Sequence, residues 1–273
     1  MAVFARMAIA VILGALVIYW KRIPFPWHRT AVKLYAYSAM GIFVGMLFVY
    51  LAANYIASGT ISLIFGMAPI LSGLMASRIL GEAKFTLIQS VSLAISLLGL
   101  GIVFSDGLSL AGENWPGYVF ILISVSFFCL SAVMVKSVTL AINPIATTQG
   151  ALLLTLPFFF FAWLIMDGEL PYEDWTSRSI YAIAYLGIFG SFLGFIAYYY
   201  ILQHLPAKTV ALITLMTPVI AMGIGAIFND ETISWNLALG ASCVMIGLLL
   251  YQFGNRIFNL TNKAQLKPNT VED

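Results

Sequence analysis

Two sixteen-residue segments of the sequence each place a proline and a glutamate in an otherwise apolar stretch. The segments are MAPILSGLMASRILGE and MTPVIAMGIGAIFNDE, and Pro69 and Glu82 of the first match Pro218 and Glu231 of the second. A proline inside a helix removes one hydrogen bond and displaces the carbonyl four residues earlier. At mid-membrane depth, such a carbonyl can face a cavity or accept a hydrogen bond from a ligand.

Each half of this motif has a functional and a structural interpretation. Pro69 and Pro218 either line a substrate cavity or simply bend their helices, and we favour the cavity because the pair is symmetric. Glu82 and Glu231 are either protonatable gates or helix-end acids that pair with a basic neighbour such as Arg78. We favour the ion pair, because a charge is only mildly desolvated at the membrane interface.

Aromatic and amide side chains recur at matching positions near these motifs. Tyr50 and Asn54 are four residues apart, as are Tyr199 and Gln203, so each pair is predicted to share a helix face. Such a face suits an aromatic or amphiphilic metabolite, and the alternative is an aromatic belt at the membrane interface. The candidate cavity residues are Tyr50, Asn54, Pro69, Ser72, Tyr199, Gln203, Thr214, Thr217 and Pro218, and the candidate gate or helix-end charges are Arg78, Glu82 and Glu231.

The composition predicts that membrane-spanning helices position these residues. Of the 273 residues, 62% are hydrophobic and 9% are charged, whereas a soluble domain carries roughly 25% charged residues. Apolar runs long enough to cross a hydrocarbon core of about 30 Å recur along the chain. We predict an all-α polytopic membrane protein with nine transmembrane helices, at about 2–20, 33–54, 59–80, 87–104, 117–136, 147–166, 180–202, 209–228 and 235–254.

The basic residues predict the orientation in the cell (inner) membrane. With the 21–32 linker in the cytoplasm, 11 of the 13 lysines and arginines lie inside or at inner helix ends. Only Arg6 and Arg178 then lie on the outer side. The C-terminus is therefore expected in the cytoplasm and Met1 outside.

The chain is predicted to be an internal duplication with an offset of 149 residues. Ten identities fall at this offset across the 42 positions 41–82, and they include glycine, proline and glutamate. Because Glu82 and Glu231 end on opposite sides of the membrane, the halves are expected to be inverted five-helix repeats. The predicted parts are a first repeat at 1–104, a second repeat at 117–254 and a cytoplasmic polar tail at 255–273.

The first repeat has only four predicted helices, because the partner of 117–136 would precede Met1. Either the first helix of a ten-helix fold is missing and Met1 is an internal methionine, or nine helices are the natural number. We favour the missing helix.

The repeated segments resemble the EamA family of the drug/metabolite transporter superfamily. The residues that carry the resemblance are Gly45, Tyr50, Ala57, Pro69 and Glu82, then Gly194 to Glu231, and Gly240 and Gly247 in the last helix. FARMAIAVILGAL, with Arg6, resembles the second helix of that family. The resemblance implies ten helices in two inverted repeats, with a central cavity that the absent first helix helps to line.

We therefore expect a secondary transporter of a small metabolite, working by alternating access. The resemblance implies an amino acid or derivative, usually exported, with a riboflavin-type importer as the alternative and a non-transporting membrane scaffold as the alternative of another class. The expected partners are the substrate, the lipid bilayer, a proton or other coupling ion and, as an open possibility, a second copy in a homodimer.

Several other functions are not expected. His28 and His204 have no acid or cysteine at ligand spacing, which argues against a metal site. No nucleotide-binding motif, cofactor motif or nucleic-acid-binding pattern is present. An enzyme is not expected, because neither histidine is deep in a span and no aspartate falls within one.

Overall fold

The computed structural model describes residues 1–81, 86–107, 114–138, 140, 142–166, 176–204, 217, 220–221, 224–228 and 233–265. No β-strand occurs among these residues. Six of their helical segments are long and apolar enough to cross a membrane, beginning at Ala2, Arg29, Ser58, Trp115, Pro144 and Ser179. An all-helical fold satisfies every backbone polar group internally, as a lipid environment requires. The predicted all-α membrane protein is confirmed.

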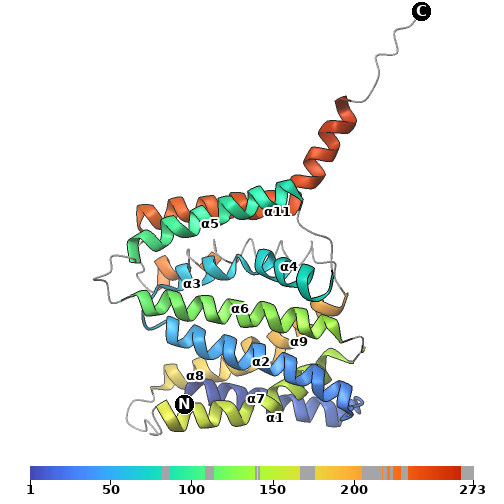
Figure 1. Cartoon of the computed structure of the whole chain (residues 1–273). Helices are drawn as coiled ribbons and strands as arrows, with labels where there is room; N and C mark the ends of the chain where they lie inside the picture. The colour runs from blue at the N-terminus through green and yellow to red at the C-terminus, as the bar shows by residue number, and fades with distance from the viewer. Residues whose placement is uncertain are drawn as a thin grey trace, which may run out of the picture. The chain divides into compact units, whose positions relative to one another are not determined.

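The helices follow the predicted spans closely (Figure 1). They are α1 (Ala2–Lys21), α2 (Arg29–Ala52), α3 (Ser58–Phe65), α4 (Ala68–Ile79), α5 (Leu87–Gly107), α6 (Trp115–Ser137), α7 (Pro144–Met166), α8 (Ser177–Tyr185), the π-helix η1 (Leu186–Leu193), α9 (Gly194–His204) and α11 (Trp235–Gln265). Eight of the nine predicted spans contain these helices, and most of the span 209–228 lies outside the described residues. The last helix continues to Gln265, into the segment predicted to be a polar tail.

Two predicted spans are interrupted. The span 59–80 was predicted as one helix kinked at Pro69, but a turn at Gly66 and Met67 divides it into α3 and α4. Pro69 therefore lies in the first turn of α4, where a proline fits because its missing N–H would have no intrahelical partner. The span 180–202 contains the π-helix η1 between α8 and α9.

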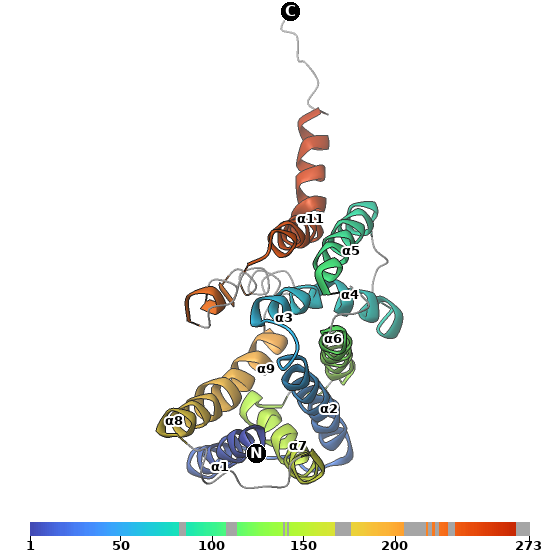
Figure 2. The same ribbon diagram turned by 90° about the vertical axis from the view of Figure 1, so that its left-hand side faces the viewer.

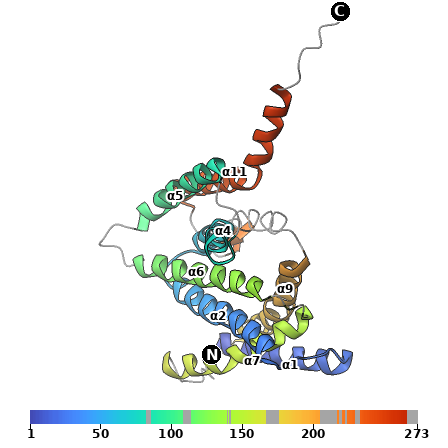
Figure 3. The same cartoon turned by 45° about the vertical axis from the view of Figure 1, so that its right-hand side comes forward.

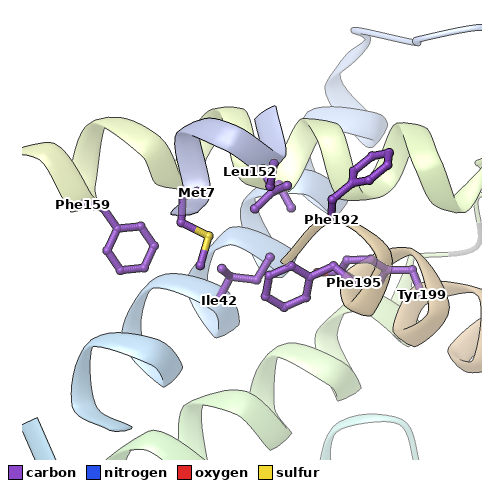
Figure 4. Close-up of a cluster of buried hydrophobic side chains, with 9 residues drawn as sticks. Met7, Ile42, Leu152, Phe159, Phe192, Phe195 and Tyr199 are labelled. Atoms are coloured by element: carbon purple, nitrogen blue, oxygen red, sulfur yellow. The ribbon is translucent and has the colours of Figure 1, made fainter. Parts of the chain in front are cut away.

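One compact unit comprises Met1–Leu47 and Phe127–Ala207. In this unit α1 packs antiparallel on α7, because Phe4 contacts Phe160 near one end and Gly14 meets Gln149 further along. The two helices and the segment from α8 to α9 lie side by side in two views (Figures 1 and 2). The core of the unit is shown in Figure 4 and consists of Met7, Ala10, Ile42, Ala151, Leu152, Phe159, Phe192, Phe195 and Tyr199.

The second unit comprises Phe48–Ser126 and Lys208–Asp273, and the boundary between the units falls within α2 and α6. Its most extensive helix pair is α5 with α11, which lie side by side (Figure 3). Gly99 faces Gly240, Ser96 faces Gly247 and Ile88 faces Gly254. The numbers rise along α5 as they fall along α11, so the pair is antiparallel. Small residues at these positions let the two backbones approach closely.

Candidate functional site

Tyr199 and Gln203, both predicted to line a cavity, lie on α9 in the first unit. Tyr199 is only 2% exposed and belongs to the apolar core, beside Phe195 of the same helix (Figure 4). Gln203 is exposed, and its Nε2 donates to the carbonyl oxygen of Ile142 at 3.0 Å. The two side chains therefore have different surroundings, and the amide of Gln203 ties the end of α9 to the loop before α7.

Tyr50 and Asn54, the equivalent pair in the second unit, do not share a helix face. Tyr50 is half-buried near the end of α2, but the helix ends at Ala52 and Asn54 is exposed in the turn that follows. The amides of Tyr55 and Ile56 both bond to the carbonyl of Ala52, at 2.9 and 3.0 Å, and these bonds close the turn. The predicted helix extension to residue 54 is therefore wrong.

Of the remaining predicted positions, two lie on α4 and one is Thr217. Ser72 is half-buried on α4, and Arg78 is exposed in the last turn of the same helix. Thr217 is exposed. Four predicted residues lie outside the described part of the chain, as does the side chain of Pro69: Glu82, Thr214, Pro218 and Glu231.

A buried charge in the first unit was not among the predicted site residues. Arg6 is 6% exposed, and its Nε donates to the Oγ of Ser191 at 2.9 Å. Ser191 is fully buried within the π-helix η1. A Cβ on Gly187 would lie 3.2 Å from the carbonyl oxygen of Arg6, so a larger residue there would crowd α1.

This contact combines two features that often occur at functional sites. Ionisable side chains within membrane spans are costly and usually functional, and π-helical turns are frequent at functional sites. The signal in the sequence was a single cation in an otherwise apolar run, FARMAIAVILGAL.

Polar oxygens buried in the first half of α7 form a second group that was missed. Residues 146–152 are all buried, so this part of the helix is enclosed on every side. Within the described parts of the chain, the Oγ1 atoms of Thr147 and Thr148 and the Oε1 of Gln149 have no hydrogen-bond partner. The Nε2 of Gln149 donates to the carbonyl of Val11 at 3.1 Å.

Unsatisfied oxygens of this kind normally contact water or a ligand, because burying them without a partner is costly. The hydroxyls of Thr147 and Thr148 are therefore candidates for contact with a polar ligand, whereas the Oε1 of Gln149 lies against Gly14 of α1. A metal centre has no support in the described residues, which contain no group of three or more histidine, cysteine or acidic side chains.

Both the sequence of the chain and its fold match known proteins. The model of the EamA-like transporter family matches residues 115–253. An uncharacterized transporter of Archaeoglobus fulgidus is 26% identical over 89% of this chain and 82% of its own length. The uncharacterized inner membrane transporter YedA of Escherichia coli is 27% identical over 74% of this chain and 64% of its own length. A solved crystal structure, 13% identical, shares the fold with a TM-score of 0.65 over 93% of this chain and 88% of its own.

Proposed function

Because the chain belongs to the EamA-like transporter family, we propose that it is a secondary transporter that moves a small metabolite by alternating access. An amino acid or derivative of aromatic or amphiphilic character, moved outward, is the favoured cargo. A riboflavin-type importer is the alternative, and a non-transporting scaffold is the alternative of another class.

The observation that best supports alternating access is the packing of equivalent helices against each other. At the offset of 149, residues 2–21 of α1 correspond to 151–170, which overlaps α7. Residues 87–107 of α5 correspond to 236–256, which lies within α11. In each unit the helix and its equivalent are antiparallel neighbours.

Antiparallel neighbours of this kind are expected when two repeats are related by a pseudo-two-fold axis in the plane of the membrane. Transporters built in this way expose a site between the repeats alternately to each side. The unsatisfied hydroxyls of Thr147 and Thr148 support a polar path, because a buried hydroxyl without a protein partner is stabilised by contact with water or a polar cargo.

A flux assay tests the proposal. The chain is reconstituted in vesicles, and the uptake and efflux of labelled amino acids, aromatic derivatives and riboflavin are measured with and without a proton gradient. Flux that needs a gradient but no ATP supports secondary transport. A chain extended upstream serves as a parallel sample, because the resemblance implies one further helix. Absence of flux for both chains with the whole panel would favour the scaffold.

The path through α7 is tested by a pair of matched variants. Thr148→Val removes an unsatisfied hydroxyl, and we expect flux to fall about ten-fold, equivalent to the loss of one hydrogen bond of about 1.4 kcal/mol. Thr155→Val is the control, because that hydroxyl lies on the same helix and already donates to the carbonyl of Leu152 at 3.0 Å. Equal flux in the two variants would remove Thr148 from the proposed path.

A further inference from the structure

A pocket of about 410 Å³ lies between the loop from α1 to α2 and the loop from α6 to α7. Both loops belong to the first unit. Pro24, Phe25, Pro26 and His28 line it from one loop, and Ile142 and Asn143 line it from the other.

The walls of this pocket are held by contacts with the helices. The hydroxyl of Tyr35 donates to the carbonyl of Pro26 at 3.0 Å, and the ring of Phe25 stacks on Tyr35 with centroids 5.6 Å apart. On the other wall, Gln203 donates to the carbonyl of Ile142. These contacts fix both walls of the pocket, and a pre-organised site lowers the entropic cost of binding.

The segment around the pocket is strongly basic. The thirteen residues KRIPFPWHRTAVK, from Lys21 to Lys33, contain four lysines and arginines, one histidine and no acid. Arg22, His28 and Arg29 are all exposed. His28 lines the pocket itself, Arg29 follows it directly, and Arg22 lies two residues before the first lining residue. The charge of the segment favours an anionic ligand.

Arg22 has an unusual backbone conformation, which supports a functional role for its basic side chain. It caps the C-terminus of α1 with φ 49° and ψ 42°, and it is the only residue other than glycine with a positive φ in the described part of the chain. Glycine is the usual residue at such a position, because a side chain makes this backbone conformation unfavourable. Strain of this kind tends to be kept where a side chain has a function.

Exposed aromatic rings place the pocket at the level of lipid headgroups. Tyr19 and Trp20 are 86% and 83% exposed at the end of α1, and Trp27 is 56% exposed in the pocket loop. Tyrosine and tryptophan concentrate where the hydrocarbon meets water. The anion most available at that depth is the phosphodiester of a phospholipid.

We propose that this pocket, which has His28 in its wall and Arg22 and Arg29 close to that wall in the sequence, binds the headgroup of an anionic phospholipid. The basic side chains neutralise the phosphate, and the apolar walls from Pro24 to Pro26 contact the glycerol and the upper part of an acyl chain. Basic pockets between transmembrane helices are known to bind anionic headgroups.

Native mass spectrometry of the full chain in neutral detergent tests the proposal. The protein is titrated with phosphatidylglycerol, with phosphatidylcholine, and with sn-glycerol 3-phosphate as the free phosphate without acyl chains. Preferential retention of phosphatidylglycerol is expected. Equal retention of phosphatidylcholine would overturn the proposal, and so would displacement of the lipid by sn-glycerol 3-phosphate, because the ligand would then be a soluble phosphate.

The variants separate loss of charge from loss of fold. Arg22→Gly and Arg29→Gln are each expected to weaken binding about five-fold, and the double variant about twenty-five-fold, as expected for about 1 kcal/mol per basic residue. Glycine suits the backbone at position 22, so that variant keeps its fold. Arg22→Lys keeps the charge, so it is expected to bind the lipid like the natural chain. Arg78→Gln is the control for loss of a basic residue elsewhere: Arg78 lies on α4 in the second unit, and lipid binding is expected to stay unchanged. Undiminished binding by the double variant would overturn the proposal.

Discussion

Replacing Gly99 of α5 by alanine should destabilise the protein, whereas the same change at Gly101 should not. Both glycines lie in the interior of the same helix. A Cβ on Gly99 would lie 2.7 Å from the carbonyl oxygen of Gly240, 2.8 Å from the Cβ of Cys243 and 2.9 Å from the amide nitrogen of Val244. A Cβ on Gly101 would meet nothing within 4 Å.

The expected magnitude follows from two opposing terms. Two of the three atoms near Gly99 are backbone atoms of α11, so α5 and α11 have to move apart to admit a methyl group. Overpacking of this kind costs about 1 to 3 kcal/mol, while alanine gains about 1 kcal/mol over glycine in a helix interior. Gly99→Ala should therefore lose up to about 2 kcal/mol, and Gly101→Ala should gain up to about 1 kcal/mol.

Equilibrium unfolding in one detergent, followed by circular dichroism, measures both variants. The expected order of the free energy of unfolding is Gly101→Ala, then the natural chain, then Gly99→Ala. If Gly99→Ala proved at least as stable as Gly101→Ala, the close backbone approach of α5 and α11 would be wrong.

Three further predictions use the same unfolding measurement. Arg22→Gly should raise the free energy of unfolding by about 1 kcal/mol, because glycine adopts the left-handed conformation without strain; a loss would contradict the φ of 49°. Gln203→Leu should lower it by about 1 kcal/mol, since the carbonyl of Ile142 loses its donor, and an unchanged value would contradict that bond. Ser191→Ala should lower it by about 1.5 to 3 kcal/mol, because a charged donor loses a buried acceptor. If the bond from Arg6 to Ser191 forms in only one state of the proposed transport cycle, Ser191→Ala should, in the flux assay, raise the apparent substrate affinity on one side of the membrane and lower it on the other. An equal change on both sides would show that the bond favours neither state.

Most of the helices could be predicted because the membrane leaves few alternatives. A chain with so few charged residues has to cross the bilayer, and lipid permits only structures that satisfy the backbone internally. Apolar length therefore places α1, α5, α6 and α7 within a few residues of their observed ends. The interruptions depend on tertiary contacts and carry weaker local signals. Pro69 correctly marks a break, but the turn itself falls at Gly66 and Met67.

The candidate site was harder to predict because the same residue types serve the core and the cavity. Tyr199 has a polar hydroxyl, yet its ring contributes to the apolar core of its unit. Asn54 was assigned to a helix that ends two residues earlier. The buried oxygens of Thr147 and Thr148 were missed because two threonines at a predicted helix start resemble capping residues. Only their complete burial distinguishes them from caps.

The contact between Arg6 and Ser191 has no chemical equivalent in the other predicted repeat. At the offset of 149, Arg6 corresponds to Thr155 and Ser191 corresponds to Ile42, so the equivalent pair carries no charge. Thr155 bonds within its own helix, and Ile42 packs in the apolar core. In a carrier built from inverted repeats, contacts with symmetric equivalents contribute equally to the inward-facing and outward-facing states. In the alternating access proposed above, a contact without an equivalent that forms in only one of the two states favours that state in the empty protein. We therefore propose that the bond between α1 and η1, which holds a buried charge without an equivalent, favours one of the two states, and the Ser191→Ala flux measurement tests this.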